Sequence, residues 1–209
     1  MKVVLATGNA GKVAELQQHL AELGFDVRAQ SEFDIPEAVE DGLTFIENAL
    51  KKARHAAALT GLPAIADDSG LEVDALHGAP GIYSARYAQR NNSGEGDQAN
   101  INYLLAQLNA QNASALEKRS ARFRCALVYM RHADDPAPLI AEGVWNGQIA
   151  LNAKGENGFG YDPIFYVLEK RCTAAELSAQ SKKELSHRGH ALRLLGTLLK
   201  QPGHSSFLP

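Results

Sequence analysis

The sequence predicts an α/β protein with a mixed central sheet flanked by helices and a second, antiparallel lobe. In the first third of the chain, short apolar runs alternate with segments of helical periodicity, which is typical of an α/β sheet. Further on, two long alternating segments predict a pair of antiparallel strands. We expect the active site in a groove between the two lobes.

The helices of the first half have clear end signals. Gly24 suits the position after a helix end, and Thr44 with Glu47 forms a capping box. The expected elements are, in order, a strand at 3–6, a loop at 7–11, a helix with apolar positions 13, 16, 20 and 23, a strand at 25–30, a loop at 31–43, a helix from 44 to 59 and a strand at 63–66.

The second half combines polar loops with the strand pair. Residues 123–130 predict a strand covered on both faces, with an antiparallel partner at 138–149. The other expected elements are a strand at 71–76, a glycine- and proline-rich loop through 87, a polar surface loop at 89–97, a helix at 98–109, a polar connection at 110–120 and a helix at 187–200. We expect a single domain over 1–200 and a C-terminal tail at 201–209.

Composition narrows the class of protein. With 209 residues, 45% hydrophobic and 22% charged, the chain is typical of a soluble globular protein. A net charge of −3 argues against a broad nucleic-acid-binding face, and no apolar stretch reaches membrane-spanning length. Cys125 and Cys172 lack metal-ligand spacing, so we interpret them as reduced thiols of a cytoplasmic protein.

The most informative motif is Asp67-Asp68-Ser69-Gly70, directly after the apolar run 63–66. It predicts two carboxylates and a hydroxyl at the carboxyl end of a strand, where open α/β sheets bind ligands, followed by a sharp turn at Gly70. One or two carboxylates together with substrate phosphates are a common magnesium site. The alternative is an ordinary turn without a ligand.

The segment from Thr7 to Lys12 is expected between a strand and a helix, where free backbone N–H groups favour an anion. It is not a Walker A motif, because two residues instead of four separate Gly8 from Gly11 and Val13 follows the lysine. A plain turn with a solvated lysine is the alternative.

Two further residues are metal or phosphate candidates. Glu40 lies in an acidic loop ahead of the capped helix and is a candidate second metal carboxylate facing Asp68. Lys52 lies on that helix. The alternative for both is a solvated surface charge.

The candidates for a base pocket lie late in the chain. Phe159-Gly160-Tyr161-Asp162 places two aromatic rings among glycines, which suits stacking on a flat heterocycle, although the rings could instead belong to the core. Lys182, His187 and Arg188 lie at or just before the last helix, and Arg188 could donate to a ring carbonyl or to phosphate. Its alternative is a helix-surface charge.

Other hydrolase sites fit poorly. The chain has no Gly-x-Ser-x-Gly elbow, and two acids directly precede Ser69, which would oppose a nearby oxyanion. The histidines show no zinc-binding spacing apart from the uninformative His187/His190 pair.

Together and in order, these motifs resemble those of the inosine triphosphate pyrophosphatase family in its bacterial form, from residue 2 to about 200. Two more segments carry the resemblance, Thr44-Phe45-Ile46-Glu47-Asn48-Ala49 and Gly78-Ala79-Pro80-Gly81-Ile82-Tyr83-Ser84-Ala85-Arg86-Tyr87. The resemblance implies a house-cleaning homodimer that hydrolyses the purine nucleotides ITP, dITP and XTP to the monophosphate and pyrophosphate with Mg²⁺.

The resemblance also implies residue roles. Asp68 is the proton acceptor and, with Glu40, a metal ligand. The implied substrate contacts are Thr7, Gly8, Asn9, Ala10, Gly11, Lys12, Lys52 and Ser69 for the triphosphate, and Phe159, Gly160, Tyr161, Asp162, Lys182, His187 and Arg188 for the nucleotide and base. A group such as Arg188 would donate a hydrogen bond to the 6-carbonyl of hypoxanthine or xanthine. The 6-amino group of adenine is itself a donor, so adenine would be disfavoured.

Two rival functions remain. One is a house-cleaning pyrophosphatase with another base preference, for example for modified pyrimidines. The other is a non-catalytic nucleotide sensor, which would have no need of the water-activating carboxylate of Asp68.

Overall fold

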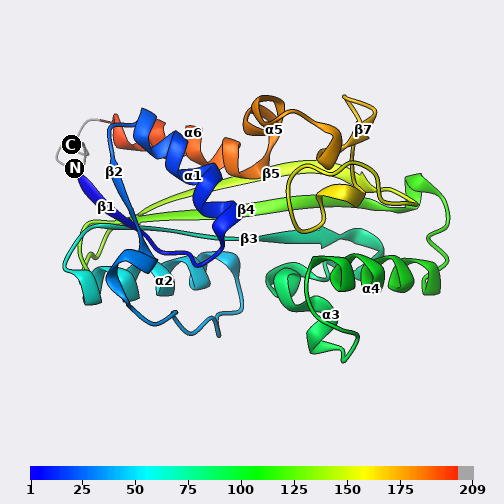
Figure 1. Cartoon of the computed structure of the whole chain (residues 1–209), viewed down its shortest axis with the longest axis horizontal. Coiled ribbons are helices and arrows are strands. Elements are labelled where there is room, and N and C mark those ends of the chain that lie inside the picture. Colours follow the sequence, from blue (N-terminus) through cyan, green and yellow to red (C-terminus); the bar gives the residue numbers. More distant parts are fainter. Residues whose placement is uncertain (202–209) are drawn as a thin grey trace. The chain divides into compact units, whose positions relative to one another are not determined.

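The structure is a computed structural model that describes residues 1–201, so the expected tail lies outside the described residues except for Gln201. Within them, seven strands follow the order β2-β1-β3-β4-β5-β6-β7 (Figure 1). The strands are β1 (Lys2–Leu5), β2 (Asp26–Ala29), β3 (Ala64–Val73), β4 (Ser120–Met130), β5 (Leu139–Ile149), β6 (Phe165–Val167) and β7 (Cys172–Thr173). β1 pairs in parallel with β2 and β3, whereas β6 pairs antiparallel with β5 and β7, which confirms a mixed sheet.

Helices follow most of the strands (Figure 1). The α-helices are α1 (Ala10–Glu22), α2 (Phe45–Thr60), α3 (Tyr87–Arg90), α4 (Asp97–Ala110), α5 (Ala179–Leu185) and α6 (His187–Leu199). The 3-10 helices are η1 (Gln30–Phe33), η2 (Asp74–Leu76), η3 (Gly81–Arg86), η4 (Leu116–Lys118), η5 (Asp162–Ile164) and η6 (Ala174–Glu176). None of the helices within residues 1–201 combines the length and the apolar character that a membrane span requires.

The chain divides into two compact units. The first comprises Met1–Asp68, Cys125–Gly143 and the chain from His187 on, and the second comprises Ser69–Arg124 and Val144–Ser186. Strands β3, β4 and β5 contribute residues to both units. The expectation of one domain over 1–200 stays a prediction.

In the first unit, neighbouring residues of each strand face different helices. One face, with Leu5 and Ile65, packs against α1 and α6 (Figure 1). The other face, with Val4, Ala64 and Ala66, packs against a row of alanines on α2. Because side chains alternate along a strand, this pattern places Asp67 and Asp68, which follow on β3, on opposite faces.

In the second unit, α4 covers an aromatic core. Leu104 and Leu108 of α4 are fully buried and belong to the same cluster as Phe123, Trp145 and Phe165. The ring centroids of Phe123 and Phe165 lie 4.5 Å apart, and those of Trp145 and Phe165 lie 4.9 Å apart.

The prediction of two separate strands at 63–66 and 71–76 was wrong. Residues 64–73 form one strand, so Gly70 is a buried strand residue rather than a turn, and the separate strand at 71–76 does not exist. The physical reason is that both flanks of the motif are apolar and buried, while cations neutralise the two aspartates within it. A buried strand can therefore run through the charged motif.

Most other elements agree with the expectation within a few residues. Asn9 and Thr44 cap α1 and α2, and Gly24 and Gly61 adopt positive φ after those helices. α1 begins at Ala10, so the second half of the expected 7–11 loop is helical. The segment expected as a loop through residue 87 forms η3, and the short elements β6, β7 and α5 were not anticipated.

Candidate active site

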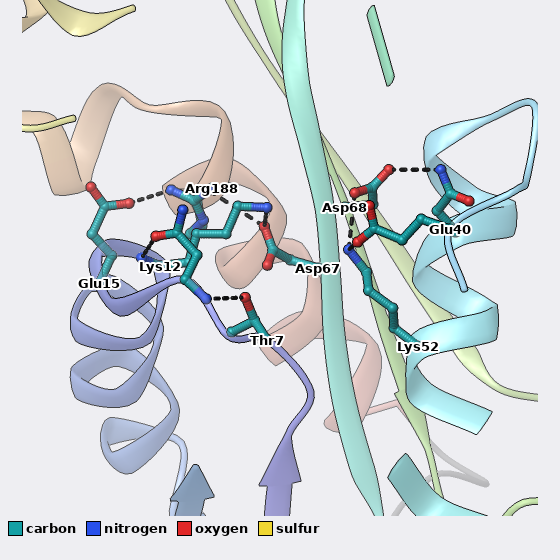
Figure 2. Close-up of polar contacts among 10 residues, drawn as sticks. Thr7, Lys12, Glu15, Glu40, Lys52, Asp67, Asp68 and Arg188 are labelled. Atoms are coloured by element: carbon teal, nitrogen blue, oxygen red, sulfur yellow. Dashed lines mark hydrogen bonds and ion pairs between the residues drawn. The ribbon is translucent and has the colours of Figure 1, made fainter. Parts of the chain in front are cut away.

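The candidate active site of the first unit is built around β3, beyond the carboxyl end of β1 (Figure 2). β1 ends at Leu5, which is opposite Ile65 in the parallel register, while β3 continues. Asp67 and Asp68 therefore lie where the chain leaves β1 for the loop that enters α1. Figure 2 shows their side chains on opposite sides of the strand.

Asp67 lies on the side of α1 and α6 and holds two cations. Its Oδ2 lies 3.1 Å from Lys12 Nζ and 3.4 Å from Arg188 Nη2, and the carboxylate is fully buried. Burial alone would raise the pKa of Asp67, but the charges of Lys12, Arg188 and Lys52 outweigh it and hold this pKa well below its usual range. Asp67 is therefore an anion that orders Lys12 and Arg188.

Arg188, in the first turn of α6, is also paired with Glu15 of α1. Burial works to lower the pKa of Arg188, but Asp67 and Glu15 raise it, so the guanidinium stays charged. The alternative of a helix-surface charge is wrong for Arg188, which is 3% exposed. Sequence analysis overlooked Glu15, although it lies one turn after Lys12 on the same helix.

Asp68 lies on the side of α2. Its Oδ1 accepts from Lys52 Nζ at 2.9 Å and its Oδ2 accepts from Asn48 Nδ2 at 3.3 Å. Glu40, from the loop before α2, also accepts from Lys52 Nζ, at 3.0 Å. Sequence analysis gave Asn48 no role, but it lies one turn before Lys52 on α2.

The pKa directions on this side follow from burial and charge. Burial raises the pKa of Asp68 above its ordinary value, although Lys52 and Lys12 oppose this. Burial would lower the pKa of Lys52, but the carboxylates of Asp68, Asp67 and Glu40 raise it. Lys52 is 11% exposed at its side chain, so the alternative of a solvated charge is wrong.

On the α2 side of β3, two carboxylates contact the same ammonium group. Glu40 and Asp68 both contact Lys52 Nζ, which is how two carboxylates would also approach a divalent cation. Residues 1–201 contain no group of three or more His, Cys, Asp or Glu side chains that could hold a metal ion by itself.

The segment from Thr7 to Lys12 connects β1 to the first turn of α1. Asn9 Oδ1 accepts from the backbone N–H of Lys12 at 3.0 Å, and Thr7 Oγ1 accepts from that of Asn9 at 3.3 Å. Gly8 lies directly against the carboxylate of Glu37, and a Cβ there would meet Oε1. The N-terminal end of α1 thus carries the polarity that favours an anion.

In the second unit, Phe159, Asp162 and Lys182 form a cluster. Asp162 Oδ2 accepts from Lys182 Nζ at 2.6 Å and from the backbone N–H of Phe159 at 2.8 Å. Lys182 Nζ lies 4.8 Å from the centroid of the Phe159 ring. Tyr161 is a buried core residue that donates to the Ser84 carbonyl at 2.9 Å, so the core alternative describes it.

The structure thus groups the predicted residues within each unit. The first unit brings together Lys12, Glu40, Lys52, Asp68 and Arg188 and adds Glu15, Asn48 and Asp67. The second unit groups Phe159, Asp162 and Lys182 and holds the half-buried Ser69 on β3. His187 is buried at the start of α6.

Comparison with known proteins identifies the family. The sequence profile of the Ham1 family matches residues 3–198. The chain belongs to the Ham1 family. A curated relative from Vibrio cholerae, named dITP/XTP pyrophosphatase, is 61% identical over 194 residues, which cover 93% of this chain and 94% of the relative.

Solved structures agree with this assignment. The Ham1 protein from Coxiella burnetii superposes with a TM-score of 0.86 at 50% identity, covering 97% of this chain and all of that one. A Mycobacterium abscessus structure described as a nucleoside-triphosphatase and dITP/XTP pyrophosphatase has a TM-score of 0.73 at 40% identity, covering 96% and 100% of the two chains. The mixed α/β fold is thus the Ham1 fold.

Proposed function

We propose that this chain hydrolyses the non-standard purine nucleotides ITP, dITP and XTP to the nucleoside monophosphate and pyrophosphate, and so removes them from the nucleotide pool. The dITP/XTP pyrophosphatase relatives, at about 60% identity over almost the whole chain, support this function. The observation that carries it is the pair of charge clusters on the two sides of β3, around Asp67 and Asp68.

In the proposed reaction, Asp68 accepts the proton of the attacking water. Burial raises its pKa, which makes it a better proton acceptor near neutral pH than an ordinary aspartate. Lys52 lies 2.9 Å from Asp68 and is positioned to stabilise negative charge on a phosphate. Positioning and charge stabilisation are the main requirements of phosphoryl transfer.

The loop from Thr7 to Lys12 and the half-buried Ser69 are the proposed triphosphate contacts. The N-terminal end of α1 favours negative charge, and Lys12 adds a cation whose position Asp67 fixes. Phe159, Gly160, Asp162, Lys182, His187 and Arg188 are the proposed nucleotide and base contacts, and Tyr161 anchors the same loop in the core. Arg188, ordered by Asp67 and Glu15, keeps its proposed role as donor to the purine 6-carbonyl.

Magnesium is the proposed cofactor, and the residues present fit it. Glu40 and Asp68 offer hard oxygen donors that already converge on one cation, the Lys52 ammonium. A bound Mg²⁺ would supply charge neutralisation to the phosphates. We also propose that the protein works as a homodimer, as the family resemblance implies, and that it is cytoplasmic, which its two free cysteines favour.

Replacing Asp68 tests this mechanism. Asp68→Asn should lower kcat for dITP by at least about a hundredfold, because the proton acceptor is lost. The variant should still fold, since Lys52 keeps Glu40 as a partner. Pyrophosphate release from dITP, measured with and without Mg²⁺, is the assay, and circular dichroism checks the fold.

Glu72→Gln is the matched control, because Glu72 is an ion-paired carboxylate on the same strand, in contact with Arg124. Its turnover should equal that of the wild type. Near-normal turnover by Asp68→Asn, or full turnover in the presence of a chelator, would contradict the mechanism. A folded wild type that binds dITP without hydrolysing it would favour the sensor.

A further inference from the structure

Hydrogen bonds within the second unit fix the aromatic loop, residues 158–162, at Phe159, Tyr161 and Asp162. Asp162 binds the Phe159 N–H and Lys182, and the Tyr161 hydroxyl donates to the Ser84 carbonyl. Between them, Gly160 adopts a φ of +60°, a conformation that glycine reaches easily. The orientation of its N–H therefore depends on what that group contacts.

That contact is a carboxylate on α4. The Gly160 N–H donates to Asp97 Oδ2 at 2.6 Å, across 63 residues of sequence. Asp97 is the first residue of α4, after Gly96, and negative charge is favourable at this end of a helix. A charge-assisted hydrogen bond of this kind is shorter and stronger than one between neutral groups.

A buried residue on the same helix fixes the position of Asp97. Asn100, one turn later and 3% exposed, accepts from the Ala88 N–H at 2.8 Å and donates to the Ala85 carbonyl at 3.1 Å. Ala85 follows Ser84, whose carbonyl accepts from Tyr161. The contacts therefore form a closed circuit from α4 through η3 to Tyr161 and from Gly160 back to α4.

We propose that Asp97 is a positioning residue for the base side of the site. Through the Gly160 N–H, it holds the aromatic loop in the conformation that presents Phe159 to the purine. This inference rests on the proposed function, in which the aromatic loop contacts the nucleotide. It gives a role to Asp97, the last residue of the polar segment expected at 89–97 and the first residue of α4.

Three variants test the proposal. Asp97→Ala removes the acceptor, whereas Asp97→Asn keeps an acceptor oxygen and loses the charge. Gln98→Ala is the matched control, because Gln98 is the next exposed residue of α4 and its side chain contacts Asn102 within the helix. The readouts are KM and kcat for dITP, the inhibition constant of inorganic tripolyphosphate, the melting temperature and the amide proton shift of Gly160.

Asp97→Ala should raise KM for dITP about tenfold, the value of one hydrogen bond, with a much smaller change in kcat. Its inhibition constant for tripolyphosphate, which has no base, should not change. Asp97→Asn should recover most of the affinity, and Gln98→Ala should match the wild type. The Gly160 amide proton should move upfield most in Asp97→Ala, less in Asp97→Asn and not at all in Gln98→Ala.

Several results would overturn the proposal. An unchanged KM in Asp97→Ala contradicts it, and so does equal weakening of dITP and tripolyphosphate. If Asp97→Asn behaves like Asp97→Ala, the negative charge at the start of α4 matters rather than the hydrogen bond to Gly160, and the proposal is wrong. A wild type without activity on dITP contradicts the proposed function instead, whereas an unmoved Gly160 amide contradicts the Asp97 contact whatever the activity.

Discussion

At the scale of single residues, two adjacent aspartates have different tasks because a strand alternates its side chains. Asp67 is fully buried with Lys12 and Arg188, whereas Asp68 faces Lys52 and is the proposed proton acceptor. Asp67 orders two cations, and under the proposed function Asp68 carries the chemistry.

Replacing Asp67 should therefore cost stability. Asp67→Asn leaves Lys12 and Arg188 with one carboxylate fewer in a buried setting, so the free energy of unfolding should fall by about 3–5 kcal/mol. Urea denaturation measures the loss. Glu72→Gln, which breaks a partly exposed pair, should cost about 1 kcal/mol or less. Equal losses in both variants would contradict the role given to Asp67.

Local pattern marked Thr7 to Lys12, Glu40, Lys52 and Asp68 as candidates, and the family resemblance supplied their roles, but neither indicated this pairing. In contrast, Arg188 contacts Glu15 across 173 residues of sequence and Asp67 across 121. Charges buried by tertiary packing leave no periodic signal, so sequence analysis left Asp67 without a role and missed Glu15.

At the scale of elements, the first turn of α6 approaches β5 so closely that only glycine fits. A Cβ at Gly143 would overlap the carbonyl oxygen of His187 and lie 2.6 Å from the Ala191 nitrogen. All these atoms are backbone and cannot rotate away. Gly143 therefore sets the position of the turn that carries Arg188.

Gly143→Ala should lower the free energy of unfolding by about 1–3 kcal/mol, since the overlap forces a backbone shift. It should also reduce the preference for dITP over dATP in kcat/KM, because Arg188 moves with α6. Glu142→Ala, at the exposed neighbouring position of β5, is the control. A stable Gly143→Ala variant with unchanged preference would contradict this role.

Elements with strong local signals were predictable, and short ones were not. Thr44 with Glu47 marks the start of α2 and Gly24 marks the end of α1, and packing also favours both helices. β6, β7 and α5 span too few residues for periodicity to mark them. β3 was divided in two because its charged middle was taken for a turn, although buried counterions allow the strand to continue.

At the scale of the whole molecule, the mixed sheet of a Ham1 protein carries two groups of predicted residues, one in each compact unit. The first unit supplies the cations and carboxylates proposed for the triphosphate and Mg²⁺. The second supplies the aromatic loop and Lys182, proposed for the nucleotide. Cleavage should therefore depend on the identity of the base, although it takes place at the phosphates.

The most direct test is the product that the wild type releases from dITP, XTP, dATP, dGTP and dUTP with Mg²⁺, with pyrophosphate and phosphate measured separately. We expect one pyrophosphate per dITP or XTP, little free phosphate, and about 5- to 150-fold lower kcat/KM for dATP, because one mismatched donor costs about 1–3 kcal/mol. Release of phosphate in place of pyrophosphate, or equal rates for dITP and dATP, would contradict the account.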